Sequence, residues 1–159
     1  MRSAIALLAL AGCKADLPKL TDAAKALDAK CTGPYADELV DSFPSTLATP
    51  QAALGAPDNN FVVLGANGVV TVAFVGLGAV TDVSGNDLRV HAMVDAGASA
   101  LVRVAGTDQQ FHYAGTLDPT TSDFDIGVAM LTSIVYVRVI DVSGAVRIDS
   151  FEAIHDVCH

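Results

Sequence analysis

The segment 134–142 reads Ile-Val-Tyr-Val-Arg-Val-Ile-Asp-Val, and the segment 69–75 reads Val-Val-Thr-Val-Ala-Phe-Val. β-Branched residues dominate both segments, and such residues favour extended strands on a half-buried surface. In the segment 87–94, apolar residues at even positions alternate with arginine, histidine and methionine at odd positions. A period of two places the two sets on opposite faces of one strand. The three segments therefore predict half-buried β-strands.

Further segments with strand character follow Tyr35. The segment 100–104 alternates clearly, and weaker candidates are 38–43, 61–64, 110–114 and 148–155. Turn-forming residues separate the strands at 57–60, 65–68, 84–87, 105–108 and 143–144. The segment 127–131 is expected to form one short helical turn. Roughly eight strands without long helices between them predict an all-β fold, an antiparallel β-sandwich, in a single domain at 35–159.

The start of the chain has the parts of a secretory signal: Arg2, a short apolar run at 4–10, and small residues before Cys13. The run is far shorter than the roughly 20 residues that cross a bilayer. Leu10-Ala11-Gly12-Cys13 resembles the lipobox of bacterial lipoproteins. The resemblance implies that 1–12 is a signal peptide cut before Cys13, and that Cys13 carries diacylglyceryl on its sulfur. The alternative is an ordinary cleaved signal with an incidental cysteine.

Lipid on Cys13 would hold the mature protein at a membrane. The expected location is the bacterial cell envelope. By similarity to enterobacterial sorting, Lys14 favours the outer membrane or cell surface over the inner membrane.

The region 13–34 joins the lipidated cysteine to the domain and includes a predicted short helix at 15–30. Asp16 suits its N-cap and Pro18 its first turn. Its apolar stripe is expected to pack on the domain, with a partner surface as the alternative. Cys31 and Cys158 are an even pair in an oxidising compartment, which suggests a disulfide. Two unrelated buried thiols are the alternative.

Composition limits the partners. The net charge of −9 argues against nucleic acid and anionic lipid headgroups as ligands. Hydrophobic residues make up 52% of the chain, yet no apolar run after Leu10 is long enough to span a membrane, so these residues are expected to fill a soluble core.

Several motifs, in their order along the chain, resemble a family of bacterial cell-surface domains with a galactose-binding-like jelly-roll fold. They are Tyr-Ala-Asp-Glu-Leu-Val at 35–40, Ala-Leu-Gly-Ala-Pro-Asp at 53–58, the pair at 62–65 and 68–74, Ser-Gly-Asn-Asp-Leu-Arg-Val at 84–90, and Tyr-Val-Arg-Val-Ile-Asp at 136–141. The resemblance implies a jelly roll and a role in adhesion or ligand binding. His91 and Ala92 depart from the family, which often has Phe and Glu there, and 148–154 only approximates its closing strand.

Loop oxygens suggest a calcium site. Asp58 and Asn60 lie in one predicted loop, and Asp82 and Asp87 flank another. Carboxylate, amide and backbone oxygens suit calcium, and jelly-roll domains of the resembling kind often hold a structural calcium between loops. The alternative is that these residues only form turns.

Catalytic patterns are absent from the sequence. No serine lies in a Gly-x-Ser-x-Gly turn, and the four histidines belong to no ligand cluster of convincing spacing. Asp123 and Asp125 flank Phe124, which more simply places both carboxylates toward solvent than in a catalytic pair. The absence of tryptophan weakens a carbohydrate platform without removing it.

The predicted function is therefore a non-enzymatic, lipid-anchored binding or adhesion module of the envelope, with a glycan or an envelope protein as partner. The alternative is a structural or assembly lipoprotein that contacts other envelope proteins and binds no small ligand.

Overall fold

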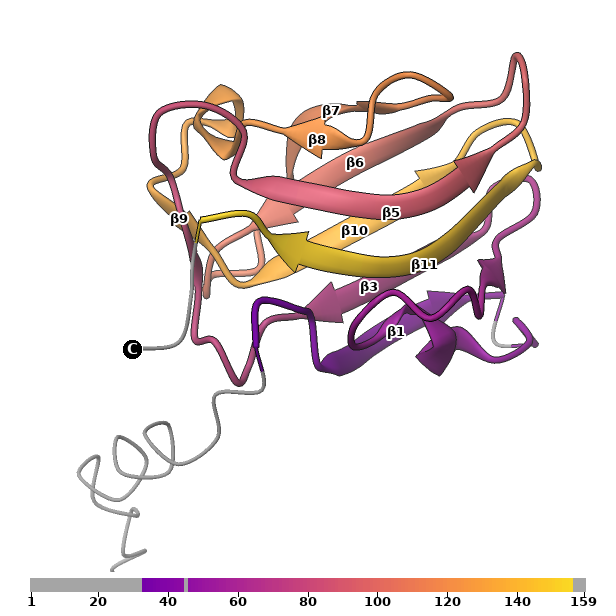
Figure 1. Ribbon diagram of the computed structural model, residues 1–159, viewed down its shortest axis with the longest axis horizontal. Helices are drawn as coiled ribbons and strands as arrows, with labels where there is room; N and C mark the ends of the chain where they lie inside the picture. Colours follow the sequence, from indigo (N-terminus) through magenta and orange to yellow (C-terminus); the bar gives the residue numbers. More distant parts are fainter. Residues whose placement is uncertain (1–32, 45, 156–159) are drawn as a thin grey trace, which may run out of the picture.

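Two antiparallel sheets form the fold, as a computed structural model shows for residues 33–44 and 46–155 (Figure 1). The first has the order β1 (Glu38–Phe43), β3 (Val69–Ala73), β10 (Tyr136–Asp141), β6 (Ala100–Ala105), β7 (His112–Leu117). The second has the order β2 (Val62–Val63), β11 (Val146–Ala153), β5 (Leu88–Val94), β8 (Asp123–Phe124). The predicted all-β antiparallel sandwich is confirmed. The signal peptide, Cys13, the helix at 15–30, Cys31 and Cys158 lie outside the described residues.

Small elements complete the sandwich. A two-stranded ladder pairs β4 (Val80–Thr81) with β9 (Ser133–Ile134). Two 3-10 helices, η1 (Pro50–Ala53) and η2 (Ile126–Ala129), cover its flanks, and η2 accounts for the helical turn expected at 127–131. No helix among the described residues is long and apolar enough to cross a membrane.

The chain changes sheet at nearly every connection between the two large sheets, as in a jelly roll. Only the β6–β7 hairpin joins neighbours of one sheet directly. The core lies between the sheets, where alternate residues of each strand point inward. Fully buried members include Val72, Val102, Val137, Leu88 and Phe151.

A bulge in β11 matters for the loops outside it. Ile148 pairs with Ala92 and Ser150 with His91, so Asp149 is the extra residue. Its carboxylate accepts hydrogen bonds from the backbone N–H groups of Asp58 and Asn59, at 3.2 and 3.1 Å. The bulge thereby ties the loop before β2 to the second sheet.

Candidate functional site

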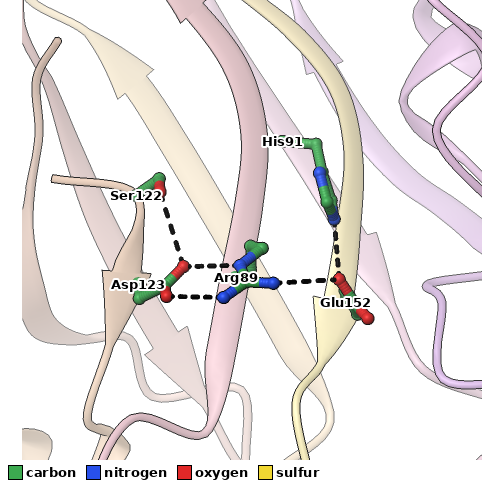
Figure 2. A network of polar contacts seen from close by, with 5 residues as sticks. All are labelled: Arg89, His91, Ser122, Asp123 and Glu152. Carbon is green, nitrogen blue, oxygen red and sulfur yellow. Dashed lines mark hydrogen bonds and ion pairs between the residues drawn. The ribbon is translucent and has the colours of Figure 1, made fainter. Parts of the chain in front are cut away.

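A network of charged side chains crosses the outer face of the second sheet (Figure 2). Arg89 on β5 faces Asp123 on β8 and Glu152 on β11, because both are its cross-strand partners. The Arg89 guanidinium donates two parallel hydrogen bonds to the Asp123 carboxylate, at 2.7 and 2.8 Å. Glu152 lies 4.0 Å from the same guanidinium and 2.7 Å from Nε2 of His91.

Within this network, the Arg89–Asp123 pair favours the charged form of Asp123. Hydrogen bonding from Arg89 holds the pKa of Asp123 below its ordinary value, while desolvation opposes the shift, and the same pair raises the pKa of Arg89. A carboxylate with a lowered pKa has no proton to give at neutral pH, as a general acid must. Ser122 also donates to Asp123, at 3.4 Å. The Arg89–Asp123 ion pair is therefore a cross-strand link between β5 and β8.

Two open clefts lie beside this network. The larger, of about 380 Å³, runs between the end of β5 and the segment 117–122. The smaller, of about 310 Å³, lies between Asn86 and the segment 120–123. Both are lined by Thr120, Thr121 and Ser122, so three hydroxyl-bearing residues border two adjoining clefts.

The segment between β7 and β8 is held in shape before any ligand arrives. Oδ1 of Asp118 accepts hydrogen bonds from the backbone N–H groups of Thr120 and Thr121 and from the Thr120 hydroxyl, at 2.7–2.9 Å. These hydrogen bonds lower the pKa of Asp118, and those from Thr120 have the largest effect. The side chain of Met93, 47% exposed, adds an apolar contact at the larger cleft.

A separate acidic cluster contains Asp82, Asp87 and Asp125, whose ligand atoms lie within 4.8 Å of one another. Buried Asp87 accepts from the backbone N–H groups of Val83 and Ile126, at 2.9 and 3.1 Å. Asp125 caps η2 by accepting from Gly127, at 2.8 Å. A Cβ at position 127 would lie 2.9 Å from Oδ1 of Asp125 and 3.0 Å from Oδ1 of Asp82, so a larger residue would make these carboxylates shift.

The structure divides the predicted calcium ligands between two places. Asp82 and Asp87 come together, and Asp125 joins them. Asp58 and Asn60 belong to the loop tied to Asp149, whereas Asp87 is bonded through its carbonyl to Ile154 beyond the end of β11. At a strand rise of about 3.3 Å per residue, these places are separated by roughly 15 Å. Asp58 instead accepts from the backbone and side chain of Asn60, at 2.9 and 2.8 Å, which lowers its pKa. The four residues therefore do not form one site.

Sequence patterns missed the Arg89 network and the clefts. Arg89 and Asp123 stand 34 positions apart, and their pairing depends on the placement of β8 beside β5. The run Asp-Pro-Thr-Thr-Ser at 118–122 was a signal that could have marked a polar turn. Asp123 and Asp125 do not act as a pair, since Asp123 binds Arg89 and Asp125 joins the acidic cluster.

Comparison with known proteins does not assign the chain to a family. No family model matches the sequence, and no curated protein matches it. The chain is similar in structure to the CBM32 of AlyQ in complex with 4,5-unsaturated mannuronic acid, with a TM-score of 0.46 and 16% sequence identity over 76% of this chain and 98% of that chain. At this level of similarity, the ligand of that module does not define a ligand for this chain.

Proposed function

We propose that this chain is a non-catalytic binding module of the bacterial envelope, tethered by lipid on Cys13, that binds a carbohydrate beside the β7–β8 segment. One observation carries the proposal: two open clefts adjoin at Thr120, Thr121 and Ser122. Hydroxyls on a preformed turn offer both donors and acceptors to a polyhydroxylated ligand. An arrangement that needs little reordering loses little entropy on binding.

The neighbouring charges support binding rather than catalysis. Arg89 and His91 hold Asp123 and Glu152 and so link β8, β5 and β11, and Asp123 also lines the smaller cleft. Outer membrane or cell-surface placement would give such a site access to glycans.

A glycan array tests the proposal directly. We expect the mature chain to bind at least one glycan, and the double variant Thr121→Val/Ser122→Ala to lose at least tenfold in affinity. Thr107→Val is the matched control, because Thr107 is an exposed threonine in another turn. Binding that survives the double variant would contradict the site. Envelope proteins that co-purify without any glycan signal would favour an assembly lipoprotein instead.

We also propose that Asp82, Asp87 and Asp125 hold a calcium ion. The donor set fits, because two carboxylates of the loop between β4 and β5 converge with Asp125, which precedes η2, and Gly127 adds no side chain beside them. Hard oxygen ligands of this kind are those that calcium prefers. Bound calcium would offset the repulsion among the carboxylates and join the loop before β5 to η2. The ion would thus fix the segment that follows β8, next to the proposed binding site.

A further inference from the structure

A row of polar side chains crosses the outer face of the first sheet, apart from the residues that line the proposed carbohydrate site. Arg138 on β10 pairs with Thr71 on β3 and with Arg103 on β6. Arg103 in turn pairs with Tyr113 on β7. The flanking valines of β10 and β6 are fully buried, so the two arginines point away from the core. They are direct cross-strand neighbours.

These two arginines differ from the others. The described residues contain four arginines and no lysine. Arg89 and Arg147 form ion pairs, with Asp123 and Asp95. Within 33–44 and 46–155, neither Arg103 nor Arg138 has a carboxylate within ion-pair distance.

Their donors are also largely unused. Nε of Arg138 donates to the Thr71 hydroxyl at 2.9 Å, and its guanidinium lies 4.0 Å from the centroid of the Phe111 ring. Nε of Arg103 is buried and has no hydrogen-bond partner in the described part of the chain. Like charges directly opposite one another destabilise a sheet. In a chain of net charge −9, two adjacent arginines without a carboxylate partner among the described residues are a local concentration of positive charge.

Aromatic side chains gather around the same pair. Phe111 stacks on Arg138, Tyr113 is the cross-strand neighbour of Arg103, and Tyr136 lies two residues before Arg138 on the same face. Tyr113 and Tyr136 are two of the three tyrosines in the chain. The Tyr113 hydroxyl lies 2.8 Å from that of Thr116. Aromatic side chains beside guanidinium groups suit a ligand whose units each combine an apolar ring face with a carboxylate.

We propose that the outer face of the first sheet binds a carboxylate-bearing polysaccharide, a polyuronate, through Arg103 and Arg138. Guanidinium groups bind carboxylates through parallel hydrogen bonds, and sugar rings pack on aromatic side chains. An acidic peptide is less suitable as a ligand, because an extended peptide adds to the edge of a sheet, here β1 or β7. The two arginines lie instead on the inner strands β10 and β6, on the face of the sheet. This site shares no lining residue with the clefts at Thr121, which lie along the connection from β7 to β8.

Polygalacturonate and its fully methyl-esterified form are the probes, because esterification removes the charge and leaves the chain of sugar rings. In isothermal titration calorimetry, we expect the mature protein to bind polygalacturonate, to bind the ester at least tenfold more weakly, and to lose affinity with added salt. Arg103→Gln should weaken binding at least tenfold. That variant removes no hydrogen bond of Nε within the described residues, so its unfolding midpoint should stay close to that of the unaltered protein.

Matched variants test whether the binding belongs to this face of the molecule. Arg147→Gln removes an arginine of the other sheet and should leave polygalacturonate binding unchanged, as should Thr121→Val/Ser122→Ala. Arg103→Lys keeps the charge without the planar fork and should bind with intermediate affinity. Equal binding of the ester, equal binding by Arg103→Gln, no binding to polygalacturonate, or equal binding of polyglutamate would each overturn the proposal. The last result would indicate an acidic peptide as partner.

Discussion

At the scale of single residues, Asp141 is a buried carboxylate that organises the turn between β10 and β11. It accepts from the backbone N–H groups of Ser143, Gly144 and Val146, at 2.7–3.1 Å, and from the Ser143 hydroxyl at 3.2 Å. Both carboxylate oxygens of Asp141 are acceptors, whereas Asp141→Asn replaces one of them by an NH₂ group, which is a donor and cannot accept these hydrogen bonds. We expect a loss of about 2–4 kcal/mol in the free energy of unfolding, measured by urea denaturation.

Asp108→Asn is the control, because exposed Asp108 accepts one backbone hydrogen bond, from Gln110 at 3.1 Å. Its effect should stay within about 0.5 kcal/mol. Equal urea midpoints for the two variants would refute the role assigned to Asp141.

Gly115 is a second position where one residue controls the packing between the sheets. A Cβ there would lie 2.7 and 2.9 Å from ring atoms of buried Phe124. Gly115→Ala should therefore destabilise the protein by about 1–3 kcal/mol through overpacking. At Gly106, an added Cβ would meet its nearest neighbour at 3.7 Å, so Gly106→Ala should cost much less. Thermal denaturation of both variants checks the difference, and a Gly115→Ala protein as stable as Gly106→Ala would show that Phe124 moves freely.

At the scale of elements, the Arg89–Asp123 pair joins β5 to β8 and makes stability depend on pH. Because the folded-state pKa of Asp123 is lowered, its contribution is complete above the unfolded pKa, about 3.9, and is lost as pH falls through the folded value. The side chains are 41% and 29% exposed, so solvent screening limits the contribution to under about 1 kcal/mol.

Asp123→Asn should have a lower free energy of unfolding than the unaltered protein at pH 7. This difference should shrink as the pH falls from about 5 toward 2. The stability difference between Arg89→Met and the unaltered protein should shrink in the same way, because Arg89 is the main cause of the lowered pKa of Asp123. Urea titrations at several pH values measure both differences. If these differences in the free energy of unfolding do not change with pH, Asp123 is not the group that titrates.

The long strands were predictable because their residues alternate over five or more positions, as in β5 and β6. The two-residue strands β4 and β8 were not, since so short an element has no measurable period. The run 134–142 was predicted as one strand, but it is divided at Val135 between β9 and β10. Val135 donates to Ala105 and accepts from Phe74, and these tertiary bonds are invisible in the sequence.

The candidate sites show the same division between local and distant information. Asp82 and Asp87 were recognised because both flank one turn. Asp125 joins them through the placement of η2 behind β8, and the Asp149 bulge that captures the other loop depends on strand register. The residues of one turn can be recognised from a short stretch of sequence. Which separate turns come into contact depends on the packing of the two sheets.

At the scale of the whole molecule, the two outer faces carry different charge arrangements. On the second sheet, Arg89 and Arg147 are paired, and the adjoining clefts offer hydroxyls. On the first sheet, Arg103 and Arg138 have no carboxylate partner among the described residues and lie beside aromatic rings. The carbohydrate site and the polyuronate site proposed above would then lie on different parts of one module, and linked contacts raise overall avidity.

Attachment to a membrane stays a prediction from the Leu-Ala-Gly-Cys motif. Cys13→Ser removes the thiol to which the diacylglyceryl group would be joined, so the variant should move from the detergent phase to the aqueous phase in Triton X-114 partition. Cys31→Ser is the control and should remain in the detergent phase. A Cys13→Ser protein still found with detergent would exclude lipid on that sulfur.

Calcium at Asp82, Asp87 and Asp125 would connect the loops at one end of the whole sandwich, and its effect should appear in global stability. A ligand that binds only the folded state stabilises it by about 2.7 kcal/mol at a hundred times its Kd. We therefore expect the thermal midpoint to fall in EDTA and to recover with calcium but not with magnesium, whose smaller ion needs near-ideal octahedral geometry.

Asp82→Asn should abolish this difference between calcium and EDTA. Asp82 is the better position to change, because its side chain is exposed, whereas loss of the buried Asp87 carboxylate would also free two backbone N–H groups. Asp58→Asn, in the loop tied to Asp149, is the control and should preserve the difference. Equal midpoints in calcium and EDTA would leave the three carboxylates as loop residues that bind no ion.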